Sequence, residues 1–159
     1  MTAVSPAGRR RLCALSLTVL VLVGGCAAPG AAAELRLAGL AGGALAESDL
    51  ASGDHVLLFF AGWSPRCRDI VERSDAVHGA WNSKARVALV DFQEKPAEVR
   101  KFFGGRSPKA PIYLDGDGAF AKKYSVTQLP FVLVFRGGEG VARGRLDDRT
   151  DGLIRDALR

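Results

Sequence analysis

An uninterrupted apolar run, Val56-Leu57-Leu58-Phe59-Phe60, is the feature that most constrains the fold of this chain. A strand in which every residue is apolar needs cover on both faces, so the run predicts a central strand in a sheet enclosed by helices. Shorter apolar segments predict further strands at 35–40, 87–90, 112–114, 131–135 and 140–143.

Helical segments are predicted between these strands, and the alternation defines the fold class. They run from Pro65 to near Trp81, from Pro96 to Phe103, around Phe120 and Tyr124, and from Leu153 to Leu158. Alternating strands and helices imply right-handed crossovers and a partly parallel sheet with helices on both faces. Gly137-Gly138 predicts a hairpin turn that adds an antiparallel edge.

The start of the chain has the layout of a secretory signal peptide. Arg9-Arg10-Arg11 form a basic start, and 12–23 is an apolar stretch too short for a comfortable membrane span. The adjoining Val23-Gly24-Gly25-Cys26 resembles a bacterial lipobox, in which the cysteine is lipidated. We therefore expect a lipoprotein signal peptide at 1–25, a tether at 26–33 and one folded domain at 34–159. Ordinary cleavage after Ala31-Ala32-Ala33 is the alternative, and a twin-arginine signal is less favoured.

The charge balance and the cysteine content reduce the number of functions that this protein can have. Three of the 22 Lys and Arg residues precede Cys26 and none of the 17 Asp and Glu residues does, which leaves 19 basic and 17 acidic residues, a net charge of +2. This balance, without a basic stripe interleaved with aromatics, argues against a nucleic-acid partner. With Cys13 in the leader and Cys26 acylated, Cys67 is a lone thiol in an exported protein.

Two segments carry a resemblance to a known superfamily. The first is the apolar run followed by Trp63-Ser64-Pro65-Arg66-Cys67, and the second is Tyr-Ser-Val-Thr-Gln-Leu-Pro-Phe-Val-Leu-Val-Phe at 124–135. Together they resemble the thioredoxin-like superfamily, and the TlpA/ResA branch of membrane-tethered bacterial thioredoxins over residues 34–158. The resemblance implies a thioredoxin-like α/β fold, with a central mixed sheet and helices on both faces, and a protein of the thiol–disulfide oxidoreductase type.

The resemblance also implies a site, from which this chain departs at Ser64, at Leu58 and at Glu72, where the family usually has a helix-kinking proline. The family has cysteine at the first and fourth motif positions, whereas this chain has Ser64 at the first and Cys67 at the fourth. The Leu129–Pro130 bond is expected to be cis, with Pro130 facing the motif. Trp63, Leu129 and Phe131 are expected to form an apolar rim that docks client polypeptides in extended form. Leu58 stands where thioredoxins place a buried acid.

Several functions remain open on the sequence. A serine hydroxyl cannot form a disulfide, so dithiol chemistry is not expected. Cys67 either exchanges as a single thiol, activated by the helix start and by Arg66 and Arg68, or is an inert residue of a redox-inactive client-binding protein. A one-Cys thiol peroxidase is an alternative, because 64–67 matches the end of the peroxiredoxin motif, although the sequence around Pro130 offers no arginine. A non-enzymatic structural partner in an envelope assembly is another.

No metal and no cofactor are expected. His55 and His78 have no second ligand at metal spacing and are interpreted as surface or strand-end residues. Asp115-Gly116-Asp117-Gly118 lacks the further ligands of a calcium loop, which favours a tight turn. The expected partners are client proteins of the cell envelope and the lipid membrane, reached through acylated Cys26. The expected location is a membrane-anchored lipoprotein with its domain outside the cytoplasm.

Overall fold

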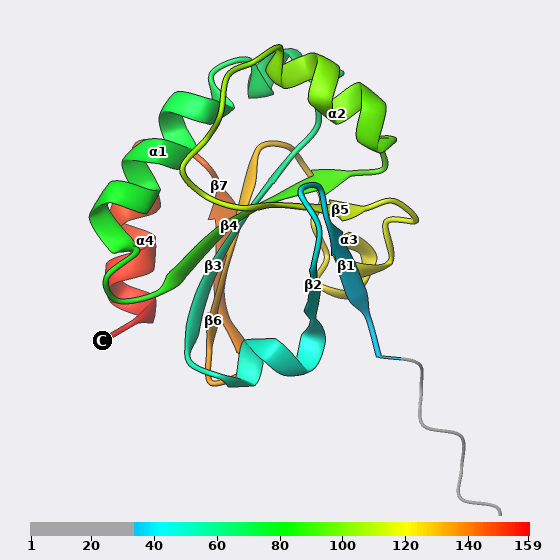
Figure 1. Ribbon diagram of the computed structural model, residues 1–159. Coiled ribbons are helices and arrows are strands. Elements are labelled where there is room, and N and C mark those ends of the chain that lie inside the picture. Colours follow the sequence, from blue (N-terminus) through cyan, green and yellow to red (C-terminus); the bar gives the residue numbers. More distant parts are fainter. Residues whose placement is uncertain (1–33) are drawn as a thin grey trace, which may run out of the picture. The chain divides into compact units, whose positions relative to one another are not determined.

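A computed structural model describes residues 34–159; the predicted signal peptide, the tether and Cys26 lie outside the described residues. The described part forms a seven-stranded sheet in the order β2-β1-β5-β4-β3-β6-β7 (Figure 1). The strands are β1 Arg36–Gly39, β2 Ala44–Ala46, β3 Asp54–Phe60, β4 Arg86–Phe92, β5 Ile112–Asp115, β6 Phe131–Arg136 and β7 Glu139–Arg145.

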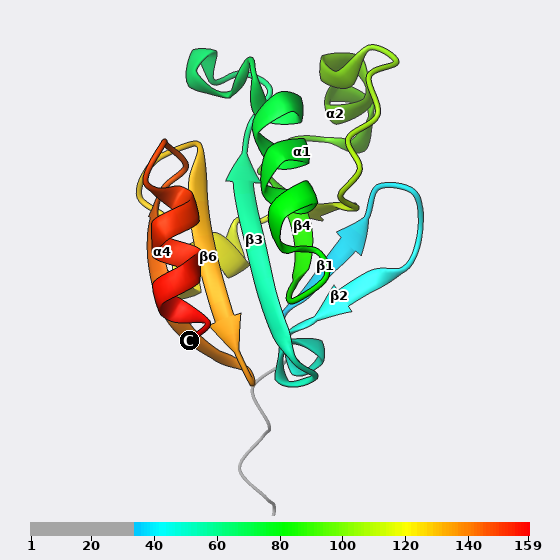
Figure 2. The same cartoon turned by 90° about the vertical axis from the view of Figure 1, so that its left-hand side faces the viewer.

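Helices cover both faces of this sheet. They are the α-helices α1 Ile70–Trp81, α2 Pro96–Phe103, α3 Ala119–Lys123 and α4 Thr150–Ala157, and the 3₁₀ turns η1 Glu47–Ala51 and η2 Pro65–Cys67. Figure 2 shows α1 and α4 side by side on one face, in front of β3 and β6. The opposite face is covered by α3 and η1, whose Phe120 and Leu50 pack there.

The apolar run forms the centre of the sheet, as its composition predicts. Strand β3 pairs in parallel with β4 and antiparallel with β6, and Val56–Phe60 are fully buried. Leu58 and Phe60 pack against the α1 and α4 side, whereas Leu57 and Phe59 pack against the α3 side. The predicted mixed sheet is therefore confirmed, with β3, β4 and β5 as its parallel part.

Local structure near the motif differs from the prediction. The expected helix from Pro65 to Trp81 is divided into η2 and α1. Pro65 has no N–H and suits a first turn, and the Cys67 N–H reaches back three residues to the Ser64 carbonyl at 2.9 Å. At Asp69 the backbone takes φ −99° and ψ 23°, outside the helical region, and the α-helix begins only after it.

Two other segments also differ in detail. Gly42 (φ 106°) and Gly43 (φ 74°) turn the chain back into β2, a strand that the sequence did not predict. The segment after it forms the 3₁₀ helix η1. The predicted hairpin at Gly137 and Gly138 is present, with φ values of 57° and 91°.

Within residues 34–159, the helices are too short or too polar to cross a membrane.

Candidate functional site

The Ser64-to-Cys67 motif lies directly beyond the end of β3. The Ser64 N–H donates to the Ala61 carbonyl at 3.1 Å, and the Cys67 N–H donates to the Ser64 carbonyl at 2.9 Å. These two bonds close successive tight turns and place Ser64 and Cys67 on one turn of backbone. The sequence predicted this placement from the strand, the tryptophan and the proline.

Cys67 is fully buried, and the burial controls its chemistry. Removal from water disfavours the thiolate, so the pKa of Cys67 is raised. Hydrogen bonds from the Ala61 backbone and the Ser64 side chain act in the opposite direction but do not outweigh burial. Since the thiolate is the nucleophile, Cys67 is a protonated and shielded thiol at neutral pH.

The charges that act on this thiol are not those expected from the sequence. Arg66 and Arg68 are exposed, and neither is among the groups that perturb the pKa of Cys67. The charged neighbours are Asp69, which raises the pKa, and Arg73, which lowers it. The prediction that the flanking arginines activate Cys67 is therefore wrong, because their side chains extend into solvent.

A groove of about 540 Å³ opens beside the motif. Its lining is made of Trp63, Ser64, Pro65, Arg66, Phe92, Val126, Thr127, Gln128 and Leu129. Trp63 is 63% exposed, the larger exposure of the two large hydrophobic residues exposed within residues 34–159. The peptide bond between Leu129 and Pro130 is cis, and Pro130 is buried behind the wall of the groove. The motif loop and the loop before β6 thus form its two sides.

The expected apolar rim is only partly present. Trp63 and the half-buried Leu129 line the groove. Phe131, which the sequence placed on the same rim, is 5% exposed and packs in the core on the α3 side of the sheet. As the first residue of β6 it alternates with Val132, so its side chain is directed to the face opposite α1.

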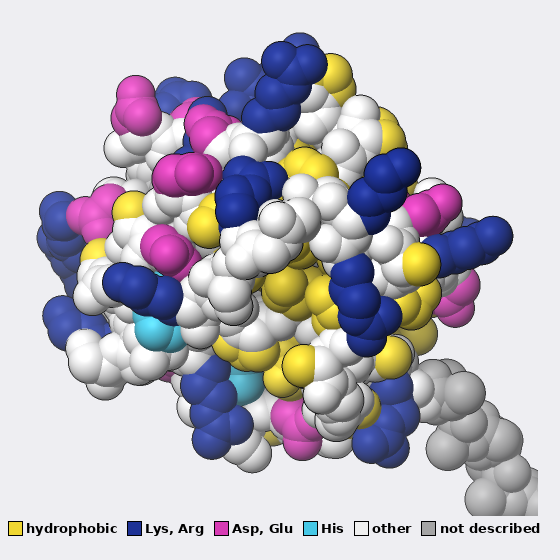
Figure 3. Space-filling model, turned by 45° about the horizontal axis from the view of Figure 1, so that its top comes forward, with side chains coloured by type: hydrophobic (Ala, Val, Ile, Leu, Met, Phe, Trp, Pro, Cys, Tyr) yellow, Lys and Arg dark blue, Asp and Glu magenta, His cyan; other side chains and the backbone are white. Residues whose placement is uncertain are grey.

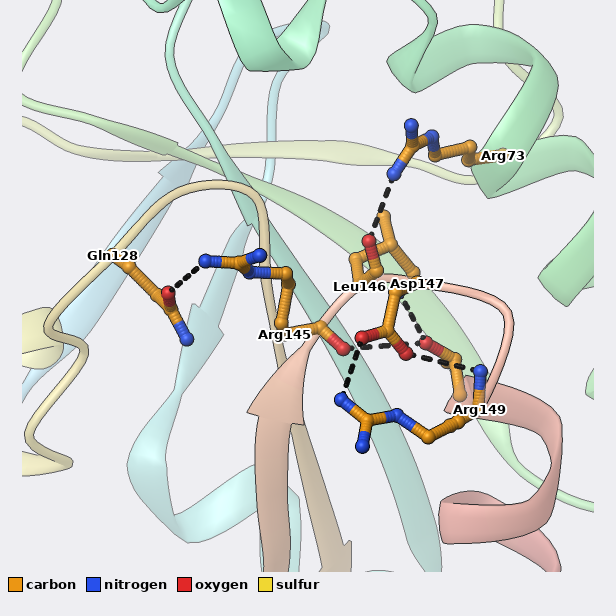
Figure 4. Close-up of polar contacts among 7 residues, drawn as sticks. Arg73, Gln128, Arg145, Leu146, Asp147 and Arg149 are labelled. Carbon is orange, nitrogen blue, oxygen red and sulfur yellow. Dashed lines mark hydrogen bonds and ion pairs between the residues drawn. The ribbon is translucent and has the colours of Figure 1, made fainter.

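An arginine that the sequence did not single out is bonded to a residue that lines the groove. Arg145 pairs with Phe131 in the β6–β7 register and donates from Nη2 to the Gln128 side-chain oxygen at 3.0 Å (Figure 4). The sequence around Pro130 contains no arginine, but strand pairing supplies one. This addition does not favour a thiol peroxidase, because Cys67 remains buried with a raised pKa.

A buried aspartate and a half-buried glutamate lie behind the motif loop. Asp91, opposite Phe60 in the β3–β4 register, is fully buried, and its Oδ2 accepts the Glu94 N–H at 3.0 Å. Burial, followed by a side-chain hydrogen bond with Glu94, raises the pKa of Asp91 to about 8. Glu94 in turn accepts the Gly62 N–H through Oε2. The loop that carries Trp63 is therefore tied through Glu94 to the buried Asp91.

The remaining polar candidates have structural roles. Asp115 accepts the N–H groups of Phe120 at 3.1 Å and Ala121 at 2.7 Å, so the aspartate-glycine segment is a turn that caps α3. His55 is not a surface residue: it is 2% exposed near the start of β3, and its pKa is lowered by burial. Within the described residues, no three His, Cys, Asp or Glu side chains are grouped as metal ligands.

Comparisons with known proteins identify the fold. No protein-family model and no curated protein sequence matches the chain. Among solved structures, a Chlorobium tepidum protein assigned as thiol:disulfide interchange protein DsbE is similar at TM-score 0.68 and 20% identity, over 79% of this chain and 94% of that one. The exposed lipoprotein thioredoxin of Streptococcus pneumoniae gives TM-score 0.67 and 20% identity, over 79% and 98%.

A third structure completes the comparison. A secreted disulfide oxidoreductase of Mycobacterium tuberculosis gives TM-score 0.62 and 17% identity, over 77% of this chain and 93% of that one. These similarities cover nearly the whole of the described domain. The predicted fold class, a thioredoxin-like α/β fold with a central mixed sheet and helices on both faces, is confirmed.

Proposed function

Since this chain has the thioredoxin-like fold, we propose that it is an exported, membrane-anchored protein that binds extended client polypeptides without disulfide turnover. One contrast supports the proposal more than any other: Cys67 is fully buried, whereas Trp63 is 63% exposed on the groove beside it. Chemistry requires an accessible thiolate, but docking requires only an accessible apolar surface.

The backbone of the groove also favours an extended ligand. Within the described chain, Thr127, Gln128 and Leu129 make no backbone–backbone hydrogen bond, so their N–H and C=O groups are free beside Trp63. An extended peptide pairs with such groups as an added strand, while a side-chain pocket supplies specificity. The solved structures similar to this chain are described as disulfide oxidoreductases or thioredoxins, and this chain differs from a redox pair by Ser64.

Trp63→Ala should abolish most of this binding. A central tryptophan is a typical interface hot spot, so we expect about a thirtyfold loss of affinity. The probe is a blocked peptide with a central leucine flanked by valine and asparagine, measured by titration calorimetry. Val141→Ala is the matched control, because Val141 is an exposed apolar residue on β7 that does not line the groove. Equal affinity of the wild type and Trp63→Ala, or no binding by the wild type, would contradict the proposal.

Membrane anchoring forms the second part of the proposal. It rests on the basic start, the short apolar stretch and the small residues before Cys26. One acyl chain gives marginal binding, so stable anchoring needs two or more chains on Cys26. Cys26→Ser should release the protein from the membrane fraction of a bacterial host and lower the mature mass by the acyl groups. A membrane-bound Cys26→Ser protein of unchanged mass would refute the anchor and leave client binding untouched.

A further inference from the structure

The charged side chains at the groove beside Trp63 are all positive. Among the described residues, Arg66 is the only charged residue that lines the groove, and no carboxylate does. On the opposite wall, Gln128 accepts a hydrogen bond from Arg145, which brings a second guanidinium to the rim. Within residues 34–159, neither arginine forms an ion pair. Both cations therefore remain available to a ligand.

Tertiary contacts hold Arg145 in this position. The Leu146 N–H donates to the Pro130 carbonyl at 3.2 Å, and Arg73 on α1 donates to the Leu146 carbonyl at 2.8 Å. Figure 4 shows this chain of contacts from α1 through the end of β7 to Gln128. The end of β7 is thereby attached to the loop that lines the groove, and the backbone that carries Arg145 is fixed beside Gln128.

The surface on the other side of Trp63 has the opposite character. A second depression, which Trp63 also lines, contains Glu94 and Glu98, with Lys101 as its only cation. Figure 3 turns the end of the domain that carries α2 toward the viewer and shows lysine and arginine side chains around exposed hydrophobic ones. Trp63 thus separates a cationic groove from a mainly acidic depression.

We propose that the groove selects client segments that carry an aspartate or glutamate next to an apolar residue. The inference rests on the proposed client binding and specifies the client. The apolar side chain lies against Trp63, and the carboxylate lies in the groove where Arg66 and Arg145 reach it. Arginine pairs with carboxylates through two parallel hydrogen bonds, and the apolar walls strengthen the attraction. A lysine at the same position meets two like charges and is rejected.

Three matched peptides test this selection. Each is blocked at both ends and has a central leucine followed by aspartate, asparagine or lysine, and each is titrated into the protein at low and high salt. We expect the aspartate peptide to bind about threefold to fivefold more tightly than the asparagine peptide, and the lysine peptide to bind most weakly. The preference should shrink at high salt.

Replacing the arginines tests whether they cause the preference for the aspartate peptide. Arg66→Gln and Arg145→Gln should each reduce it, and the double variant should bind all three peptides alike. Arg136→Gln is the matched control, since Arg136 is an exposed arginine at the far end of β6 and should leave the preference intact. If the double variant does not fold, the two single variants still test the proposal, because each should show a reduced preference.

The outcomes separate the two proposals. Equal binding of all three peptides by the wild type would overturn the acidic preference and leave client binding standing. An aspartate preference that survives in both single variants and in the double variant would overturn it as well, because the carboxylate would then be recognised elsewhere. Failure of every peptide to bind would overturn the proposed function itself.

Discussion

Ser64→Cys should form a disulfide with Cys67 under mild oxidation and create a dithiol redox activity. The Cys67 N–H bonds to the Ser64 carbonyl at 2.9 Å, as in a tight turn, where the first and fourth Cα atoms lie within about 7 Å. Disulfides join Cα atoms about 4.4–6.8 Å apart. The Ser64 side chain is among the groups that lower the pKa of the Cys67 thiol, so a sulfur in place of the hydroxyl starts near its partner.

The measurement counts free thiols with Cys13 and Cys26 replaced by serine, so that Cys67 is the only natural thiol. The wild-type motif should show one thiol that is protected from alkylation until the protein unfolds, because Cys67 is buried with a raised pKa. The Ser64→Cys protein should show none after oxidation and should reduce insulin with dithiol as the electron donor.

The matched control for this variant is Ser83→Cys. It adds a thiol just after the C-terminal end of α1, whereas Cys67 lies before the start of that helix. This protein should keep its thiols free. If Ser64→Cys also kept two free thiols after oxidation, the backbone at 64–67 would not be that of a disulfide site. The interpretation of the motif would then be wrong.

Asp91→Asn should make the free energy of unfolding of the domain much less dependent on pH. The pKa of Asp91 is raised from 3.8 to about 8, so the folded state retains a proton that the unfolded chain has lost above about pH 4. Stability from this group is therefore complete at low pH and decreases as the pH rises toward 8. Where the folded state binds one proton more than the unfolded state, the free energy of unfolding falls by about 1.4 kcal/mol per pH unit.

Asparagine preserves the shape of Asp91 and the acceptor for the Glu94 N–H, but it does not titrate. We expect a flatter curve of unfolding free energy against pH for Asp91→Asn in urea titrations between about pH 5 and pH 8. Asp156→Asn is the control, since it removes the same formal charge from an exposed side chain of α4. Parallel curves for the wild type and Asp91→Asn would show that the buried carboxyl is ionised in the folded protein.

Local patterns in the sequence were sufficient for most of the fold. The run Val56–Phe60 predicts a central strand because only a strand covered on both faces accommodates five consecutive apolar residues. Gly137-Gly138 predicts a hairpin because glycine adopts positive φ without strain. The resemblance also identified the cis bond before Pro130 and the serine that replaces a redox cysteine. Each of these signals lies within a few consecutive residues.

The site itself was predicted less completely, because its properties depend on contacts between distant segments. Phe131 was expected on the rim, but the register of β6 turns it into the core. No local signal marks Arg145 as a neighbour of Gln128, since β6–β7 pairing brings them together. Asp91 is the last buried residue of β4, and no local signal in the sequence marks its carboxyl as buried.

The sequence by itself determined which chemical groups are present at the motif: one sulfur, one hydroxyl and a tryptophan beside them. Only the tertiary structure decided that Cys67 is inaccessible, that Trp63 is exposed and that Arg66 lines the groove, with Arg145 bonded to its Gln128 and Glu94 and Glu98 lying in a separate depression. The physical reason is that exposure and pKa are set by everything packed around a group, and in a sheet of mixed strands those neighbours come from segments far apart in the chain.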